Sequence, residues 1–288
     1  MNAHDRPANL NLLDECEDAL SVPQAPLIER NDYGHPSVFL PEVMLHEARK
    51  QKKLRDAPVP AICLLDPDGD ITTYVQRELR ASKSASWACF HTELWEWDHA
   101  GRRFGIVGRA VGASFAVLVA EQLFVSGCKL LVSISSAGAI ADGLPKPSYV
   151  LVERALRDEG TSYHYLPPAP FAVAGTHLFA AALDGILAAG LPVIAGVSWT
   201  TDAPFRETAQ TIVERQKQGV HIVEMEAAAL LAFAQARNKP LLAVAHVTNA
   251  MGHGPDDFDK GDGHGAETAL AIASAIANIL PVDPASAL

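Results

Sequence analysis

The sequence predicts an α/β fold in which a mainly parallel sheet is covered by helices on both faces. Short apolar runs bounded by turn residues predict strands at 60–65, 103–108, 130–135, 148–153, 192–199 and 241–248. Helical patterns between or after these runs predict helices at 113–126, 177–189, 206–218, 226–236 and 266–279. Strands that are apolar throughout and alternate with helices are typical of a parallel sheet that is buried on both faces.

The first part of the chain has a different character from the rest. Residues 1 to about 34 are polar and contain Pro23, Pro26 and Gly34, which indicates an arm rather than a core element. A short helix is expected after Pro41. We therefore expect an N-terminal arm and short helix over 1–50 and one catalytic domain over 51–288.

Composition and charge exclude some classes of function. The chain of 288 residues is 49% hydrophobic and 20% charged, as in an ordinary globular protein. Its formal net charge is -11, and it has no long basic run of the kind that a nucleic-acid surface needs. This charge does not exclude a small anionic ligand held by one or two arginines.

The cysteines and the N-terminus indicate a compartment. Cys16, Cys63, Cys89 and Cys128 are widely spaced and fit no zinc pattern, so free thiols in a reducing environment are expected. There is no signal-peptide pattern and no apolar run of membrane-spanning length. We expect a cytoplasmic protein without a membrane or nucleic-acid partner.

Small and polar residues end several of the predicted strands. These ends are residues 108–112, 135–138, 200–202 and 248–249. In an open parallel sheet, ligands bind beyond the carboxyl ends of the strands, so these segments predict a binding site. A dinucleotide site is disfavoured, because the glycines around Gly108 do not fit G-x-G-x-x-G.

An acidic pair opens the predicted helix at 226–236. The stretch V-E-M-E-A-A-A-L covers residues 223–230 and places Glu224 and Glu226 around Met225. Acids near a helix N-terminus interact favourably with the helix dipole, which explains the pair without any function. Residues two apart point to different sides of a helix, so one acid could instead enter a cleft.

Four stretches together resemble the nucleoside phosphorylase family. They are G-R-A-V-G-A-S-F-A, L-L-V-S-I-S-S-A-G-A-I, W-T-T-D-A-P-F-R-E-T and V-E-M-E-A-A-A-L, within a match over about 58–281. The resemblance implies a three-layer α/β/α fold around a mostly parallel, mixed, twisted sheet. It also implies a pentosyltransferase that cleaves the N-glycosidic bond of a nucleoside. The expected enzyme is a homo-oligomer (a dimer or a trimer of dimers) that uses no cofactor and takes phosphate as a candidate co-substrate.

The resemblance implies roles for individual residues. Glu226 falls on the acid that binds the ribose hydroxyls, Met225 on the residue that packs against the sugar, and Glu224 on a further acid. Asn249 stands where the purine enzymes have an aspartate, although it could simply close a strand as a turn residue. The expected catalytic residues are Glu226, Asn249 and Arg206, and the expected substrate-binding residues are Met225, Glu224, Phe205, Thr200, Ser136, Gly138 and Arg109.

These residue types fit glycosidic cleavage. The reaction passes through an oxocarbenium-like sugar, and a carboxylate on the ribose hydroxyls gains strength as positive charge develops. The leaving base becomes anionic and needs a donor. Arg206, in the loop with Phe205, is such a donor. Neither the nature of the base, purine or pyrimidine, nor the oligomeric state follows from the sequence.

The phosphate half of the expected site departs from the family. Leu65 stands at a family glycine, and the positions of three family arginines hold Gly69, Thr92 and Ser133, so that only the Ser136 hydroxyl remains. Three aspartates, Asp66, Asp68 and Asp70, make the turn acidic. Arg109 either replaces part of the lost charge or is a surface arginine.

Three functions therefore stay open. The first is phosphorolysis to free base and ribose 1-phosphate. The second is hydrolysis to free base and ribose, because family members that use water also lack the full arginine set; Glu224, Glu226 or a nearby histidine could then be the base. The third is nucleoside binding without catalysis.

Histidines raise two further alternatives. His246, His253 and His264 lie near Asp256, Asp257, Asp259 and Asp262, but their spacing fits no EF-hand or H-E-x-x-H pattern. We therefore expect a Gly/Asp loop rather than a metal site. His35 is a candidate for reaching the ribose of an adjoining subunit, as an N-terminal histidine does in the uridine enzymes that the chain resembles.

Overall fold

The computed structural model describes residues 26–29, 32–250 and 258–280, and within them ten strands form one sheet. The strands are β1 (Ile62–Asp66), β2 (Ser82–Lys83), β3 (Leu94–His99), β4 (Arg102–Gly108), β5 (Leu130–Ala139), β6 (Ser148–Asp158), β7 (Phe171–Val173), β8 (Val193–Thr201), β9 (Ile222–Glu224) and β10 (Leu241–Ala250). The helices are α1 (Pro41–Lys52), α2 (Asp70–Arg77), α3 (Ala113–Val125), α4 (Thr176–Ala188), α5 (Ala209–Lys217), α6 (Ala227–Arg237) and α7 (Ala266–Ala277). Short 3-10 turns are η1 (Thr161–His164), η2 (Pro204–Arg206) and η3 (Asp262–Gly265).

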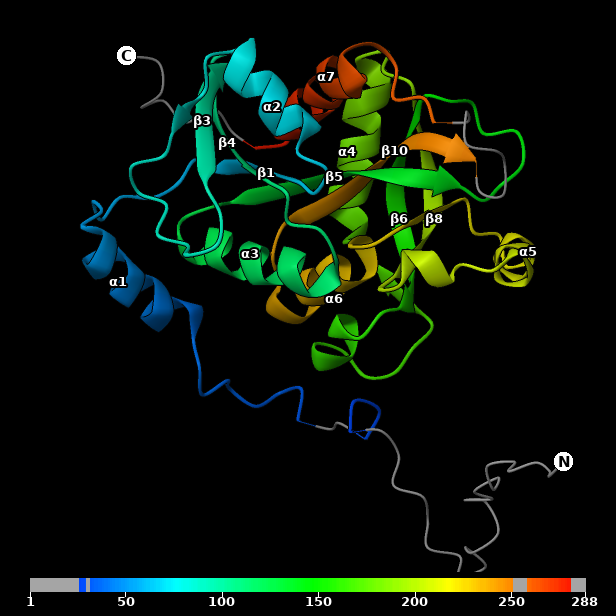
Figure 1. Cartoon of the computed structure of the whole chain (residues 1–288), viewed down its shortest axis with the longest axis horizontal. Helices are drawn as coiled ribbons and strands as arrows, with labels where there is room; N and C mark the ends of the chain where they lie inside the picture. Colours follow the sequence, from blue (N-terminus) through cyan, green and yellow to red (C-terminus); the bar gives the residue numbers. More distant parts are fainter. Residues whose placement is uncertain (1–25, 30–31, 251–257, 281–288) are drawn as a thin grey trace, which may run out of the picture.

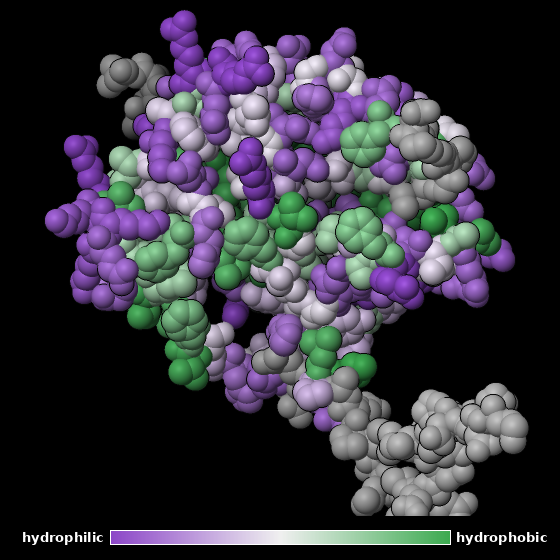
Figure 2. Space-filling model, in the orientation of Figure 1, coloured by the Kyte–Doolittle hydropathy of each residue, from purple (hydrophilic) through white to green (hydrophobic). Residues whose placement is uncertain are grey.

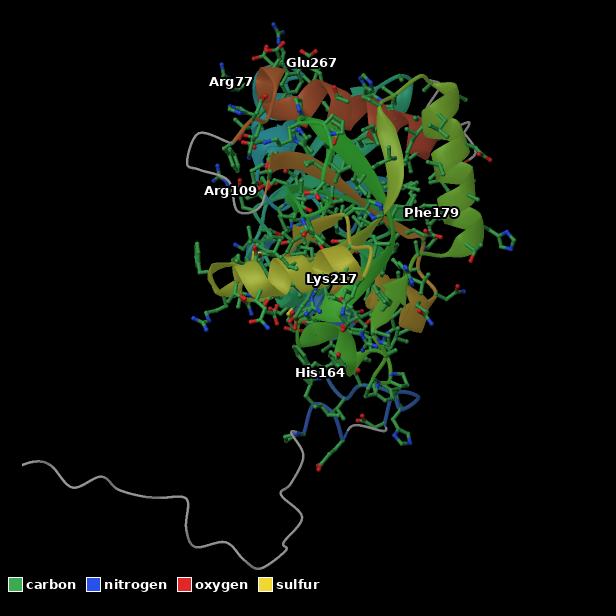
Figure 3. All side chains as sticks on the ribbon, turned by 90° about the vertical axis from the view of Figure 1, so that its right-hand side faces the viewer. Arg77, Arg109, His164, Phe179, Lys217 and Glu267 are labelled. Carbon is green, nitrogen blue, oxygen red and sulfur yellow. The ribbon has the colours of Figure 1, made fainter. Side chains whose placement is uncertain are left out.

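The helices form layers on both faces of the sheet, so the predicted α/β/α arrangement is confirmed. Figure 1 shows α2, α4 and α7 on one face, and α3 and α6 on the other, with α1 beside α3. In the turned view of Figure 3, the labelled Arg109 lies on the opposite side from Phe179 of α4. No helix in the described residues is both long enough and apolar enough to span a membrane.

A parallel group of strands forms the centre of the sheet, as the apolar runs predicted. β1 lies between β4 and β5 and is parallel to both, and β5 is also parallel to β10. All five residues of β1 are buried. The antiparallel pairs, such as β3 with β4 and β10 with β6, make the sheet mixed.

Part of the sheet closes into a ring of strands. β5 pairs with both β9 and β10, and the path β10-β6-β8-β9 returns to β5. The register sets Gly138 of β5 opposite both Asn249 of β10 and Val223 of β9. Glu224 of β9 in turn lies opposite Thr200 of β8. The closed ring therefore brings together strand ends that are far apart in the sequence.

The two helix layers bury separate apolar clusters. On one face, Phe233 of α6 and Leu123 of α3 are fully buried, and on the other Ile106 and Leu151 pack with Ile276 of α7. Complete burial of such a side chain contributes about 1.5–3 kcal/mol relative to exposure. Alanines at the start of α6, all buried, let this helix approach the sheet closely.

The structure confirms the predicted strands and helices but adds elements that the sequence patterns did not indicate. The unexpected elements are α2, β2, β3, β7 and β9. α5 begins at Ala209 rather than at 206, because residues 204–206 form η2 and the Thr208 hydroxyl caps the helix by accepting the Thr211 N–H at 3.2 Å.

The expected helix after residue 40 is α1. Its buried residues Leu45 and Ala48 pack with Ala88, so this helix contacts the remainder of the fold. Residues 1–25 of the expected arm, with Cys16, lie outside the described residues. The division into 1–50 and 51–288 stays a prediction.

Candidate functional site

Glu224 anchors the junction of β9, β8 and α6. The side chain is buried, and one carboxylate oxygen, Oε1, accepts the hydroxyls of Ser198 at 2.7 Å and Thr200 at 2.5 Å. The other, Oε2, accepts the backbone N–H groups of Glu226 at 2.7 Å and Ala227 at 2.6 Å. Burial raises the pKa of Glu224, and these donors oppose that shift. Glu224 thus holds in place the backbone of Glu226, the second acid of the pair.

Glu226 occupies the position before the first residue of α6 and is 3% exposed. Its Oε1 accepts the backbone N–H of Gly112 at 2.7 Å. Gly112 has a φ of 89°, in the left-handed region that favours glycine, and it begins α3. Burial, followed by the charge of Glu224, raises the pKa of Glu226 to about 8. Hydrogen bonds donated by bound hydroxyl groups would lower this pKa and so favour the ionised carboxylate.

The turn after β1 brings Asp68 against Ser136. Asp68 Oδ2 accepts the Ser136 backbone N–H at 2.6 Å, and Asp68 Oδ1 accepts the Ser136 hydroxyl at 2.7 Å. After burial and the charge of Glu224, the charge of Asp68 contributes further to the raised pKa of Glu226. The hydroxyl of Ser136, which was expected to bind phosphate, is therefore already hydrogen-bonded to a carboxylate of the chain, that of Asp68.

Asp66 holds this turn in shape. Its carboxylate accepts the backbone N–H of Gly69 at 3.1 Å and that of Thr72 at 2.7 Å, and so caps the start of α2. Burial raises the pKa of Asp66 to about 6. The acidic turn that was expected only to repel phosphate is thus a defined structure in which Asp66 and Asp68 have different roles.

The roles of Asn249, Met225 and Thr200 in binding the sugar stay predictions, and the structure places these residues as follows. Asn249 is half-buried opposite Gly138, and its Oδ1 accepts the Thr248 hydroxyl at 3.2 Å. Met225 is half-buried between the two acids. Thr200 lies beneath the site rather than in it, because it is fully buried, donates to Glu224 and accepts the Ala228 N–H at 2.8 Å.

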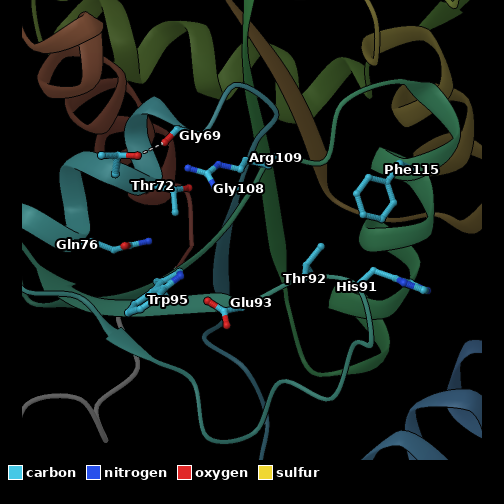
Figure 4. Close-up of a pocket in the computed structure, with 11 residues that line it drawn as sticks. Gly69, Thr72, Gln76, His91, Thr92, Glu93, Trp95, Gly108, Arg109 and Phe115 are labelled. Carbon is cyan, nitrogen blue, oxygen red and sulfur yellow. Dashed lines mark hydrogen bonds between the residues drawn. The ribbon is translucent and has the colours of Figure 1, made fainter.

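Arg109 lines a neighbouring cavity of about 360 Å³. Its φ is 66°, and its backbone N–H donates to the Asp66 carbonyl at 2.8 Å. A Cβ atom at Gly69 would lie 3.0 Å from Arg109 Cγ, so the arginine fills space that Gly69 leaves empty. Figure 4 shows its side chain extending toward Gly69 and Thr72, with Trp95 also in the lining. Among the described residues, no carboxylate forms an ion pair with this guanidinium.

Phe205 and Arg206 project from η2, directly after β8. Both side chains are exposed, and Phe205 is completely so. Within the described part of the chain, no hydrogen bond or ion pair links either of them to the acid pair. Their role in holding the base stays a prediction, as does that of His35, which is also exposed.

The late histidines do not form a metal centre in the residues that can be described. His246 is buried and stacks on Tyr149 with ring centroids 4.6 Å apart, and burial lowers its pKa. His264 belongs to η3. His253, Asp256 and Asp257 lie outside the described residues, and within the rest no group of three or more metal-ligating side chains gathers.

Sequence reasoning missed Ser198 and two contacts, that of Gly112 with Glu226 and that of Asp68 with Ser136. Gly112 and Glu226 are 114 residues apart, and Asp68 and Ser136 are 68 apart, so no local pattern joins them. The sequence held only a weak indication of these contacts, because Asp68 and Gly112 each lie within a few residues of the end of a predicted strand.

Comparison with known proteins now decides the family. Residues 68–278 match the family described as the phosphorylase superfamily. The chain belongs to the phosphorylase superfamily. This match covers well over half of the chain and includes every expected site residue, and it confirms the resemblance to nucleoside phosphorylases.

Individual members of the superfamily are only distantly similar. A DeoD-type purine nucleoside phosphorylase of Colwellia psychrerythraea is 26% identical over 151 residues, which is 52% of this chain and 64% of the relative. The Streptococcus thermophilus enzyme of the same name is 24% identical over 159 residues, 54% of this chain and 74% of the relative. The chain therefore aligns with less than two thirds of the first of these relatives.

A solved structure supports the fold of the superfamily. The crystal structure of purine nucleoside phosphorylase from Toxoplasma gondii, in complex with immucillin-H, superposes with a TM-score of 0.66. The alignment covers 79% of this chain and 94% of that chain at 16% sequence identity. At this identity the likeness shows a shared fold alone.

Proposed function

We propose that this superfamily member cleaves the N-glycosidic bond of a nucleoside and releases the free base. The observation that carries the proposal is the buried Glu226, held on the Gly112 N–H at a junction that Glu224 fixes. A carboxylate has about four acceptor positions, and the Gly112 N–H uses one, so Glu226 retains acceptors for two ribose hydroxyls.

Catalysis would follow from how Glu226 responds to the reacting sugar. Donation by the ribose hydroxyls favours the ionised carboxylate and lowers its pKa from the raised value of the empty site. As the C–N bond breaks, the sugar gains positive charge, and the carboxylate then stabilises the transition state more than the ground state. Met225, beside Glu226 in the chain, would pack against the sugar ring.

The base would lie between Asn249 and the η2 residues. Asn249 can donate a hydrogen bond from its amide but cannot transfer a proton as an aspartic acid does. Phe205 offers a ring for stacking, and Arg206 offers a guanidinium for a carbonyl oxygen of the base. The relatives are named as purine enzymes, and a panel of purine and pyrimidine nucleosides tests which base this chain accepts.

Two acceptors are candidates for the ribosyl group. The names of the relatives favour phosphorolysis, which gives ribose 1-phosphate. The contact of Asp68 with Ser136 favours water, which gives free ribose, because a second anion would meet a carboxylate there. Arg109 is the cation that would assist phosphate, since its side chain lies over the Gly69 position.

The experiment measures release of free base by chromatography, with and without phosphate, for the protein and for its Glu226→Ala variant. We expect release from at least one nucleoside and its loss in the variant. Binding of a nucleoside by calorimetry, without release of base at high protein concentration, would instead support a non-catalytic binding protein. Base release that survives Glu226→Ala would mean that another group holds the sugar.

We also propose that the protein acts as a cytoplasmic homo-oligomer. Figure 2 shows apolar side chains exposed on the face where α1 and α3 lie, and large exposed patches commonly mark interfaces. The exposed apolar residues in and next to these helices include Val38, Phe39, Leu40, Val43, Val111, Leu118 and Val125. Light scattering after gel filtration tests the oligomer, and a monomeric mass at micromolar concentration would contradict it.

A further inference from the structure

We propose that Asp68 takes the place of an acceptor anion at Ser136, in the small pocket that both residues line, and so excludes phosphate and leaves water as the acceptor of the ribosyl group. The inference rests on the proposed cleavage of a nucleoside and specifies its acceptor. It assigns Asp68 as the residue that determines this specificity, on the basis of its two hydrogen bonds from Ser136, in the second half of β5.

The contact between Asp68 and Ser136 has the form of an anion-binding site. Ser136 offers two donors, its backbone N–H and its hydroxyl, and each meets a different oxygen of one carboxylate, at 2.6 and 2.7 Å. Bonds from such donors to a charged oxygen are stronger than those between neutral groups. A phosphate ion bound at Ser136 would require the same two donors, and it would first have to displace Asp68.

The position of Asp68 is fixed by the turn rather than left to a flexible side chain. Pro67, which precedes it, restricts the backbone, and Asp66 binds the N–H groups of Gly69 and Thr72 on the other side. Gly69, which follows Asp68, has a φ of 85°. Displacement of Asp68 by a free ion would therefore also disturb the cap of α2.

Nearby acidic side chains disfavour the binding of a second anion in this pocket. Asp66 and Asp70 line the same pocket as Asp68, so an incoming phosphate would meet three acidic side chains there. Lys260, which lines the same pocket, already pairs with Asp70. Arg109 lies over Gly69 in the separate cavity, and no hydrogen bond or ion pair of the described residues joins it to Asp68 or Ser136.

The resulting reaction balances without a further reactant. The oxygen of water forms a bond to the anomeric carbon, and the C–N bond breaks with its electron pair going to the base nitrogen. The proton that water loses is matched by the proton that the base gains. The products are the free pentose and the free base, with no ribose 1-phosphate.

The test compares the full-length protein with its Asp68→Ala and Asp68→Asn variants. Alanine empties the pocket, whereas asparagine keeps its shape and removes the charge. Asp184→Ala, on the exposed surface of α4, is the matched control because it changes the net charge equally, far along the chain from the site. Thermal melting checks that each variant is folded.

Binding of inorganic phosphate is the first readout, by calorimetry without any nucleoside. We expect about a tenfold or greater gain in phosphate affinity for Asp68→Ala, a smaller gain for Asp68→Asn and none for Asp184→Ala. Millimolar or tighter phosphate binding by the unaltered protein, or no gain in folded Asp68→Ala, would overturn the inference.

The second readout is the product, followed by phosphorus NMR and chromatography of the base. The unaltered protein should release base at the same rate with and without phosphate and form no ribose 1-phosphate, whereas Asp68→Ala should form it in phosphate buffer. Ribose 1-phosphate from the unaltered protein would overturn the inference and leave nucleoside cleavage intact. Absence of base release from any nucleoside would refute the proposed function, and phosphate binding would still decide whether Asp68 fills the pocket.

Discussion

Glu224 accepts the backbone N–H of Glu226 at 2.7 Å, so one acid of the pair holds the chain segment that carries the other. The two carboxyl groups differ in their partners. Glu224 receives four hydrogen bonds from β8 and α6, whereas Glu226 receives the N–H of Gly112 from across the site. We therefore expect substitutions of Glu224 to affect the fold and substitutions of Glu226 to affect the chemistry.

Glu226→Gln should lower kcat by about 100-fold or more while leaving the fold intact. Glutamine keeps an oxygen for the Gly112 N–H but removes the negative charge that stabilises the developing sugar cation. Steady-state kinetics on the nucleoside that the protein prefers, with a thermal melt of the same sample, measures both effects. An increase in KM at unchanged kcat would show that Glu226 only binds the ground state.

The pH dependence of kcat/KM should report the ionisation of Glu226. Burial and the Glu224 charge raise its pKa to about 8 in the empty site, and the ionised form is the one that accepts ribose hydroxyls. We expect kcat/KM to rise with pH, to reach half its maximum near pH 8 and to level off above about pH 9, because this parameter follows the free enzyme. A flat profile between pH 6 and 9 would contradict the assignment.

Glu226 should also make the protein less stable as the pH rises. Because its pKa in the folded state is above its ordinary value of 4.5, the folded state binds the proton more tightly than the unfolded state. The stabilisation from the protonated group is complete below about pH 4.5 and is lost as the pH rises to about 8. Urea unfolding across this range should show a shallower decline for Glu226→Gln; an unchanged slope would contradict the raised pKa.

Glu224→Gln should destabilise the protein by about 3 kcal/mol. Glutamine replaces one carboxylate oxygen by an NH2 group, which cannot accept hydrogen bonds. If that group takes the place of Oε2, it faces the N–H groups of Glu226 and Ala227, which would lose their acceptor. Urea unfolding of this variant beside Asp184→Ala, an exposed control, gives the difference. A loss of activity without loss of stability would indicate that Glu224 contacts the substrate, as the family resemblance implied.

The sequence indicated the strands and the acid pair because these signals are local. Apolar runs predicted β5 and β10 correctly, and V-E-M-E-A-A-A-L drew attention to Glu226. The closing of the sheet through β9, a strand of three residues, left no such pattern. The contact of Asp68 with Ser136 depends on the parallel pairing of β1 with β5 and on a turn that the sequence showed only as a cluster of acidic residues.

Phe205→Ala should raise KM by about tenfold with little change in kcat or stability, since stacking of a base on an aromatic ring contributes about 1–3 kcal/mol. The ring is fully exposed in the structure, so its loss removes no core packing. Phe205→Tyr keeps the ring and is the matched control, for which we expect a KM close to that of the unaltered protein. Equal KM values for the alanine and tyrosine variants would show that the base lies elsewhere, away from η2 (Pro204–Arg206).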